Sequence, residues 1–178
     1  MSKIKVITCC AMFCALCFVS TLLIIIPLPN GYVNAGDVFV LLSGWCMGYI
    51  GIVSASIGSA LADILSGYTF YSPATFVIKG LVALVCYTIY LITKKAIKKD
   101  KFDFLLRAIS AICAEIVMVV GYFLFETALY GVAGGILSVL GNLMQGGFCA
   151  VLATLVVSVL YKVKYFSSIF PKLKITEI

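Results

Sequence analysis

The chain of 178 residues contains no histidine, and only 11% of its residues are charged. The lack of histidine excludes serine–histidine catalytic pairs, HExxH metalloprotease helices and zinc sites that combine cysteine with histidine. The sequence also has no GxxxxGK[ST] phosphate-binding loop, which excludes an ATP-driven motor of that type within it. Apolar residues make up 63% of the chain, and the mean hydropathy is +1.19. This composition is typical of integral membrane proteins.

Long polar stretches are missing as well. The two longest are residues 94–107 and the segment that follows Tyr161, and each is too short to form a separate folded domain. We therefore expect one integral membrane domain over residues 1–178.

Lysine and arginine outnumber the acidic residues by 13 to seven, and they are grouped. All of them except Lys79 flank apolar segments, in three clusters: Lys3 and Lys5; Lys94, Lys95, Lys98, Lys99, Lys101 and Arg107; Lys162, Lys164, Lys172 and Lys174. The positive-inside rule places such clusters on the cytoplasmic side of a membrane. The charge therefore predicts orientation in a lipid bilayer rather than a nucleic-acid partner.

The eight cysteines all fall in apolar segments: Cys9, Cys10, Cys14, Cys17, Cys46, Cys86, Cys113 and Cys149. Zinc ribbons need two CxxC pairs, or one pair with histidine, on loops. This chain has one such pair, formed by Cys14 and Cys17. We expect the cysteines to pack as apolar side chains and predict no metal site.

Apolar runs predict the helices. A first helix over residues 5–26 has about the length that crosses a ~30 Å bilayer core, which favours a retained helix over a signal peptide. We expect it to stop at 27–31, which contain two prolines. The further predicted segments are 37–49 and 51–66, each short for a full span; 73–93, opened by Ser72 as N-cap; 108–127; a loop or loose turn at 131–135; and 136–161.

The basic clusters constrain how often the chain crosses the membrane. If all three clusters are cytoplasmic, an even number of crossings separates each from the next. The region 37–66 must then add two crossings or none. The simplest solution is an all-α membrane protein with six transmembrane helices and both termini in the cytoplasm.

Residues 31–80 carry three charges within largely apolar sequence: Asp37, Asp63 and Lys79. Such charges are costly in a membrane and mark ligand or ion sites. We expect Asp63 and Lys79 to lie at similar depths from the outer face and to form an ion pair. Two interpretations stay open, a structural lock between helices and a pair that a polar ligand opens. Asp37 begins a predicted helix, where it caps the backbone amides or contacts a ligand.

Further polar and aromatic groups also allow both a structural and a ligand-binding interpretation. Asn142 and Gln145 share a helix face at spacing three, beside several glycines; they form interhelical hydrogen bonds or clamp a ligand. Glu126 is placed near the outer rim, where it can be solvated, and Glu115 lies deep without an assigned partner. The aromatic residues near the outer side, Tyr68 among them, form an interfacial belt or a stacking surface for a small heteroaromatic molecule.

Several runs together resemble the substrate-binding S components of energy-coupling factor (ECF) transporters, in their riboflavin-type or uncharacterised branch. These runs are GYVNAGDVFVLL, IGSALADILSGY, SPATFVIKG and GNLMQG, and the similarity covers nearly the whole chain. It implies a six-helix fold. The candidate substrate-binding residues in these motifs are Asn34, Asp37, Asp63, Tyr68, Thr75, Lys79, Asn142 and Gln145.

The resemblance also implies partners. A small-residue pair at spacing four, Ala11 and Ala15, matches the family's contact with a transmembrane T subunit that carries two ATPase subunits. ATP would be used by those partners, with no cofactor bound by this chain. In the family mechanism the S component binds its substrate outside and then tips over in the cell membrane to release it.

We therefore expect a multi-pass cell-membrane protein that is not an enzyme and that binds a small water-soluble vitamin or related heteroaromatic micronutrient. The substrate classes are riboflavin, pyridoxine and hydroxymethylpyrimidine. Two alternatives stay open: an intramembrane enzyme that uses Asp63 or Glu115 as acid or base, and a structural membrane protein that transports nothing.

Overall fold

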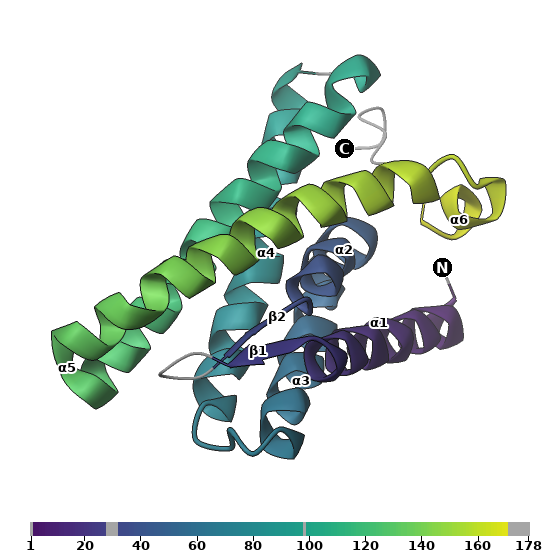
Figure 1. The fold of residues 1–178 in the computed structure, drawn as a ribbon. Helices are drawn as coiled ribbons and strands as arrows, with labels where there is room; N and C mark the ends of the chain where they lie inside the picture. The colour runs from purple at the N-terminus through teal and green to yellow at the C-terminus, as the bar shows by residue number, and fades with distance from the viewer. Residues whose placement is uncertain (1, 28–31, 98, 171–178) are drawn as a thin grey trace.

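A computed structural model describes residues 2–27, 32–97 and 99–170 (Figure 1). The helices are α1 (Lys3–Leu23), α2 (Asp37–Met47), α3 (Gly51–Leu65), α4 (Ser72–Ile97), α5 (Asp103–Leu160) and α6 (Lys164–Ile169), with short 3-10 turns at Gly48–Ile50 and Asp100–Phe102. The strands are β1 (Ile25–Pro27) and β2 (Tyr32–Asn34). Within the described residues, four stretches are long and apolar enough to cross a membrane: Lys3–Leu23, Asp37–Leu65, Ser72–Ile97 and Asp100–Leu160. These stretches confirm the prediction of a helical membrane protein.

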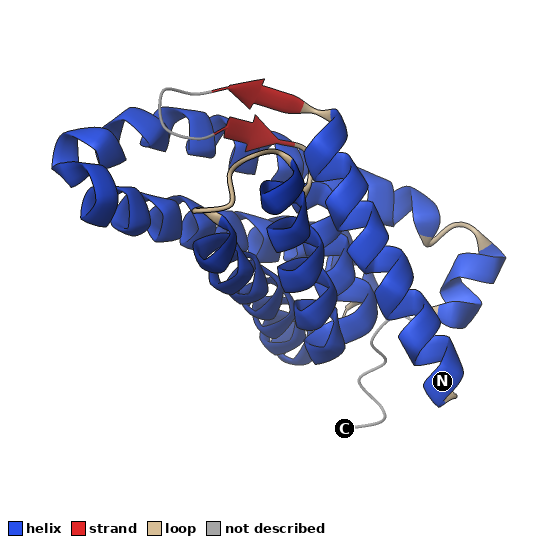
Figure 2. Ribbon diagram, turned by 90° about the horizontal axis from the view of Figure 1, so that it is seen from below, coloured by secondary structure: helices blue, strands red, loops and turns tan. Residues whose placement is uncertain are grey.

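A small antiparallel hairpin was not expected from the sequence. Strands β1 and β2 pair with Ile25 opposite Asn34 and Pro27 opposite Tyr32. The first helix therefore ends at Leu23 rather than at residue 26. The β-branched residues Ile25 and Ile26 favour extended backbone, and Pro27 cannot continue a helix. Of the predicted helix stop at 27–31, residues 28–31 lie outside the described part of the chain. Figure 2 shows the hairpin at one end of the helices.

The stretch 37–65 turns back on itself between α2 and α3. A straight helix of its 29 residues would separate its ends by roughly 43 Å. Asp37 at its start instead contacts Lys79, which lines the same cavity as Asp63 near its end. Gly48 makes the turn with a φ of +61°, and the Ser43 hydroxyl reaches the Gly51 carbonyl at 3.2 Å. The stretch thus returns to the end of the molecule at which it began, as an even number of crossings requires.

Helix α5 is likewise folded into two antiparallel halves, which are seen side by side in Figure 1. The kink lies at Gly131, where φ is +76° and ψ is 174°, a conformation that favours glycine. Across the two halves, Gln145 Nε2 lies 3.6 Å from Met118 Sδ. The predicted helices 108–127 and 136–161 correspond to these halves. The predicted loop or loose turn at 131–135 is confirmed at Gly131, where the chain turns, and is wrong for 132–135, which are helical.

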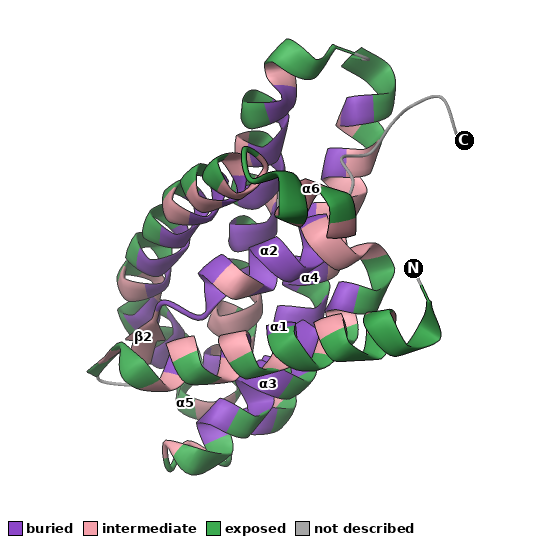
Figure 3. Ribbon diagram, turned by 90° about the vertical axis from the view of Figure 1, so that its right-hand side faces the viewer, coloured by how far each residue is buried: buried purple, intermediate pink, exposed green. Residues whose placement is uncertain are grey.

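Small residues allow close packing between helices. A Cβ atom added at Gly44 in α2 would lie 2.8 Å from the Ala83 carbonyl oxygen of α4. The Ser54 hydroxyl of α3 donates to the Cys10 carbonyl of α1 at 3.0 Å. Ser72 is the first residue of α4, and its hydroxyl donates to the Ala60 carbonyl at 3.0 Å. Its predicted role as N-cap is therefore wrong. Figure 3 shows buried residues on the inner faces of the helices and exposed residues on their outer faces.

Two residues of the second basic cluster are buried rather than free flanking charges. The Lys94 ammonium lies 2.7 Å from Asp100 and 3.1 Å from Asp103, and Arg107 Nε lies 3.1 Å from Asp103. Tyr90 donates to Asp103 at 2.6 Å and accepts from Arg107 at 3.0 Å. The Arg107 guanidinium also lies over the rings of Trp45, Tyr90 and Tyr161. This basic-end network joins α2, α4, the first half of α5 and Tyr161, which directly follows the second half.

Candidate functional site

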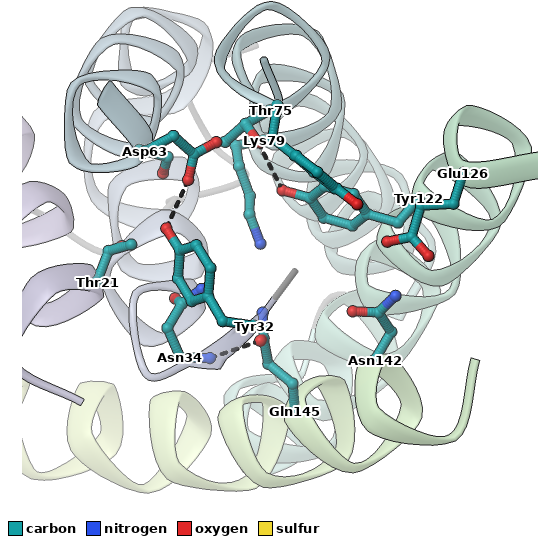
Figure 4. A pocket seen from close by; sticks show the side chains of 12 residues that line it. Thr21, Tyr32, Asn34, Asp63, Thr75, Lys79, Tyr122, Glu126, Asn142 and Gln145 are labelled. Atoms are coloured by element: carbon teal, nitrogen blue, oxygen red, sulfur yellow. Dashed lines mark hydrogen bonds between the residues drawn. The ribbon is translucent and has the colours of Figure 1, made fainter. Parts of the chain in front are cut away.

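The polar residues converge on a pocket between the hairpin and the helices (Figure 4). It is lined by Thr21 of α1, Tyr32 and Asn34 of β2, Ser59 and Asp63 of α3, Tyr71 just before α4, Thr75 and Lys79 of α4, and Tyr122, Glu126, Asn142 and Gln145 of α5. Its cavity volume is about 20 Å³, which holds about one water molecule. The pocket is therefore closed in this conformation.

The Lys79 ammonium is buried and bound. Lys79 Nζ lies 2.5 Å from Asp37 Oδ1, and the side chains of both residues are at most 3% exposed. Gln145 Nε2 donates to the other oxygen of Asp37. The predicted pair of Lys79 with Asp63 is therefore wrong, because α2 brings Asp37 within reach of Lys79. The predicted capping role of Asp37 is also not observed, since Gly36 precedes α2 and no side chain caps it.

Asp63 instead accepts a hydrogen bond from the Tyr32 hydroxyl at 2.5 Å. Tyr32 stands on β2, and the bond therefore attaches the hairpin to α3. Burial and the neighbouring Asp63 carboxylate raise the pKa of Tyr32, so the hydroxyl stays protonated and remains a donor. The second Asp63 oxygen, Oδ2, has no hydrogen-bond partner among the described residues.

The hairpin is attached to α5 as well. The backbone amide of Asn34 donates to Gln145 Oε1 at 2.7 Å, while the Asn34 side chain accepts from the Gly36 amide at 2.8 Å. The Tyr68 ring packs on the Tyr32 ring with centroids 4.7 Å apart. The Asn34 carbonyl also accepts from Cys149 Sγ of α5 at 3.7 Å. Strand β2 therefore covers the pocket through one hydrogen bond to α3, two to α5 and an aromatic contact.

Most of the candidate residues from the sequence come together here. Asn34, Asp63, Thr75, Lys79, Asn142 and Gln145 line the pocket. Asp37 lies behind it, in contact with Lys79 and Gln145. Tyr68 does not line it and instead supports Tyr32 from outside. Whether these residues bind a ligand stays a prediction.

Other lining residues were not among the candidates. These are Thr21, Tyr32, Ser59, Tyr71, Tyr122 and Glu126. The expectation that Glu126 is solvated is wrong, because it is only 2% exposed. Tyr122 and Glu126 are four residues apart and therefore share a helix face, a signal that the sequence already contained. The Tyr122 hydroxyl forms a 3.0 Å hydrogen bond with Thr75.

Glu115 lies outside the pocket, beside Gly146 in the interface between the halves of α5. It is 4% exposed, and neither of its carboxyl oxygens has a hydrogen-bond partner among the described residues. The part of the chain that the structure describes contains no group of three or more cysteine, aspartate or glutamate residues that can hold a metal ion. All eight cysteines are free thiols.

Comparison with protein families identifies the chain. Residues 1–162 match the family described as "ECF-type riboflavin transporter, S component". The chain belongs to this family. The resemblance found in the sequence is thereby confirmed: the protein is an S component, and its long apolar helices are those of a membrane protein. The family assigns it to transport rather than to catalysis.

A relative of this S component occurs in Pyrococcus woesei and is described as "Uncharacterized protein in gap 3'region". The two sequences are 30% identical over 130 residues, which cover 71% of this chain and 82% of the relative. That description names no ligand, so the relative does not narrow the substrate.

Proposed function

We propose that this S component binds a small water-soluble vitamin, or a related heteroaromatic micronutrient, of the riboflavin, pyridoxine or hydroxymethylpyrimidine class. The observation that carries the proposal is the closed pocket, in which Lys79, Asp63, Asn142 and Gln145 come together from three helices. These side chains supply both donors and acceptors, and tyrosine rings beside them offer stacking surfaces. Buried polar groups of this density are costly in a membrane protein and indicate a binding site.

The pocket would face the outside of the cell. Helix α1 carries Lys3 and Lys5 at its start and Thr21, a lining residue, near its other end. Helix α4 likewise places Lys79 near its start and Lys94 in its last turn. If the basic end is cytoplasmic, the pocket opens to the exterior of the cell membrane, and the helices α1 to α4 with the two halves of α5 make six crossings.

Ligand entry would require the hairpin to move, because the cavity of about 20 Å³ is much smaller than a vitamin. Two hydrogen bonds join β2 to lining residues of the pocket, from Tyr32 to Asp63 and from the Asn34 amide to Gln145, beside the weaker bond from Cys149 Sγ to the Asn34 carbonyl. Each contributes on the order of 1 kcal/mol. A ligand that offers its own donors to Asp63 and Gln145 replaces them, so the polar groups remain satisfied after opening.

Transport would be driven by partners. The small residues Ala11 and Ala15 are both exposed on α1, four apart and therefore on one face. Small residues let a second membrane helix approach closely, and we assign this face to the T subunit. The T subunit and two ATPase subunits would supply the energy from ATP, and the S component would tip over in the membrane to release its substrate.

Binding and uptake together test the function. Purified protein in detergent is titrated by calorimetry with riboflavin, pyridoxine and 4-amino-5-hydroxymethyl-2-methylpyrimidine, and uptake is measured in cells that also express an ECF module. We expect saturable binding of at least one compound and uptake that depends on the module. Conversion of a bound compound without partners would favour an intramembrane enzyme. Absence of both binding and complex formation would favour a structural protein.

A further inference from the structure

Two carboxyl groups in the pocket are each left with an unused oxygen. Asp63 Oδ2 and Glu126 Oε2 are buried and have no hydrogen-bond partner among the described residues. The two residues are 3% and 2% exposed and line the same pocket. In Figure 4 they lie on opposite sides of the central space. A buried carboxylate oxygen without a protein donor is destabilising, and at a pocket wall it is an acceptor that a donor group of a ligand can use.

Among the described residues, the neighbouring hydroxyl groups form no hydrogen bond to either of these two oxygens. The Thr75 hydroxyl, beside Asp63, shares a 3.0 Å hydrogen bond with the Tyr122 hydroxyl, in which either oxygen can be the donor. The Ser138 hydroxyl, beside Glu126, donates to the Gly135 carbonyl at 3.0 Å. Each hydroxyl has a single proton to donate. The acceptors on the two carboxyl groups therefore remain available to a ligand.

The lysine of the pocket does not neutralise them either. Lys79 is held by Asp37, so its charge is balanced within the protein. Glu115, which lies nearby outside the pocket, is a further acidic group rather than a cation. The described charged residues around this region therefore comprise one ammonium group and four carboxyl groups: Lys79, and Asp37, Asp63, Glu115 and Glu126. This region therefore has more acidic than basic side chains, even though the whole chain is basic.

We propose that the pocket selects a ligand with a positively charged amino group, which binds between the carboxyl groups of Asp63 and Glu126. The inference rests on the proposed function and narrows its substrate to amine-bearing, single-ring heteroaromatic compounds. A protonated amine has three donors, enough to donate one hydrogen bond each to Asp63, Glu126 and one amide oxygen of the pocket. A single ring also demands less opening of the closed cavity than a three-ring compound does.

The aromatic lining supports a cationic ligand. Tyr32, Tyr71 and Tyr122 all line the pocket, and the Lys79 ammonium already lies 5.4 Å from the centre of the Tyr122 ring. The electron-rich face of a tyrosine ring attracts a cation at such distances, most strongly where water is excluded. The tyrosines that would stack on a heteroaromatic ring therefore also favour its positive charge.

Matched pairs of probes test the charge alone. Pyridoxamine and pyridoxine differ at one position, where an aminomethyl group replaces a hydroxymethyl group. The aminomethyl and hydroxymethyl forms of 4-amino-2-methylpyrimidine make a second such pair. Titration of the purified S component at pH 7 is expected to give, in at least one pair, binding of the amine at least tenfold tighter than binding of the alcohol. This measurement needs no variant and so does not depend on the folding of one.

Three matched variants locate the effect. Glu126→Gln and Asp63→Asn keep the shape of each side chain and remove its charge, and at least one of them is expected to lose the preference for the amine. Glu115→Gln makes the same change in a buried carboxyl group outside the pocket and is expected to keep the preference. Without ligand, all three variants should be at least as stable as the parent to heat, because each loses a desolvated charge. A purely structural role would give reduced stability instead.

The outcomes separate the inference from the proposed function. Tight binding of riboflavin or of the alcohols, with no preference for the amines, overturns the inference and leaves the function in place. Preference retained in both Glu126→Gln and Asp63→Asn also overturns it. Failure of every probe to bind contradicts the inference, and complex formation with the T subunit then decides whether the proposed function stands.

Discussion

Lys79 and Asp37 are 42 residues apart in the sequence and form a buried ion pair of 2.5 Å. The pair stabilises the fold mainly because each charge neutralises the other. Either charge alone would be buried without a partner, which is costly. Gln145 adds a donor to the same carboxylate and ties α5 to the pair. The pair therefore fixes α2 against α4 and α5, two of the helices that line the pocket.

A double-mutant cycle measures this coupling. Lys79→Met should reduce the free energy of unfolding by roughly 3–5 kcal/mol, because it leaves the Asp37 carboxylate buried and unpaired. Asp37→Asn combined with Lys79→Met should recover most of the loss, since no charge remains. Denaturation of the detergent-solubilised variants provides the values. Losses that simply add would mean that the two residues act independently.

The pairing partner is the part of the site that the sequence did not predict. Asp63, Lys79, Asn142 and Gln145 were found from their polar character within apolar segments, and all line the pocket. Helical depth placed Lys79 level with Asp63, but depth says nothing about which neighbour a side chain faces. That choice depends on how α2 packs against α4, which is a tertiary property.

At the scale of elements, the hairpin is the least firmly attached part of the pocket. Its strands have three residues each, and isolated two-stranded hairpins are only marginally stable. Its position over the pocket depends on the side chains of Tyr32 and Gln145. The hairpin is thus the element that can move with the smallest loss of packing.

Tyr32→Phe tests this attachment. The variant loses the hydrogen bond to Asp63, so the amide hydrogens of residues 32–34 should exchange several-fold faster, as expected for about 1 kcal/mol. Hydrogen exchange followed by mass spectrometry measures the change. Tyr68→Phe is the matched control, because it keeps the aromatic contact with Tyr32 and should leave exchange unaltered. Equal exchange in Tyr32→Phe and the parent would show that the bond does not hold the strand.

Elements were predicted from sequence to different degrees. The short helices α2 and α3 and the start of α4 were found closely, because Gly48, Pro73 and the glycine-rich segments interrupt the apolar pattern. The hairpin was missed because three-residue strands leave no periodic signal. The helical course through 132–135 was missed because Gly134 and Gly135 read as a loop, whereas packing between the halves of α5 keeps them helical.

At the scale of the whole molecule, orientation can be measured directly. In a variant without native cysteines, single cysteines at Phe70 and Val132 should react with an impermeant reagent added outside, because both residues are exposed at the pocket end. Cysteines at Lys95 and Tyr165 should react only after the membrane is opened. Labelling of position 70 from the cytoplasmic side alone would contradict the six-crossing arrangement.

Docking to the T subunit is tested on α1. Ala11→Trp with Ala15→Trp should abolish co-purification with the T subunit and vitamin uptake, because bulky side chains prevent close helix packing. Ligand affinity in detergent should stay within a few-fold. Ile112→Trp with Ile116→Trp is the control, since these residues are also exposed and four apart, on α5. A complex that survives the alanine replacements would place the docking surface elsewhere.

The burial of the pocket charges has a consequence for rotation in the bilayer. Asp37, Asp63, Lys79 and Glu126 are all at most 3% exposed, so the dehydration of these ions is complete once the chain has folded. A toppling S component would carry this end from the aqueous interface into hydrocarbon without stripping water from any of the four again. The free-energy barrier to toppling would then arise from the exposed basic groups at the opposite end, and mostly from those that leave the anionic headgroups of the inner leaflet.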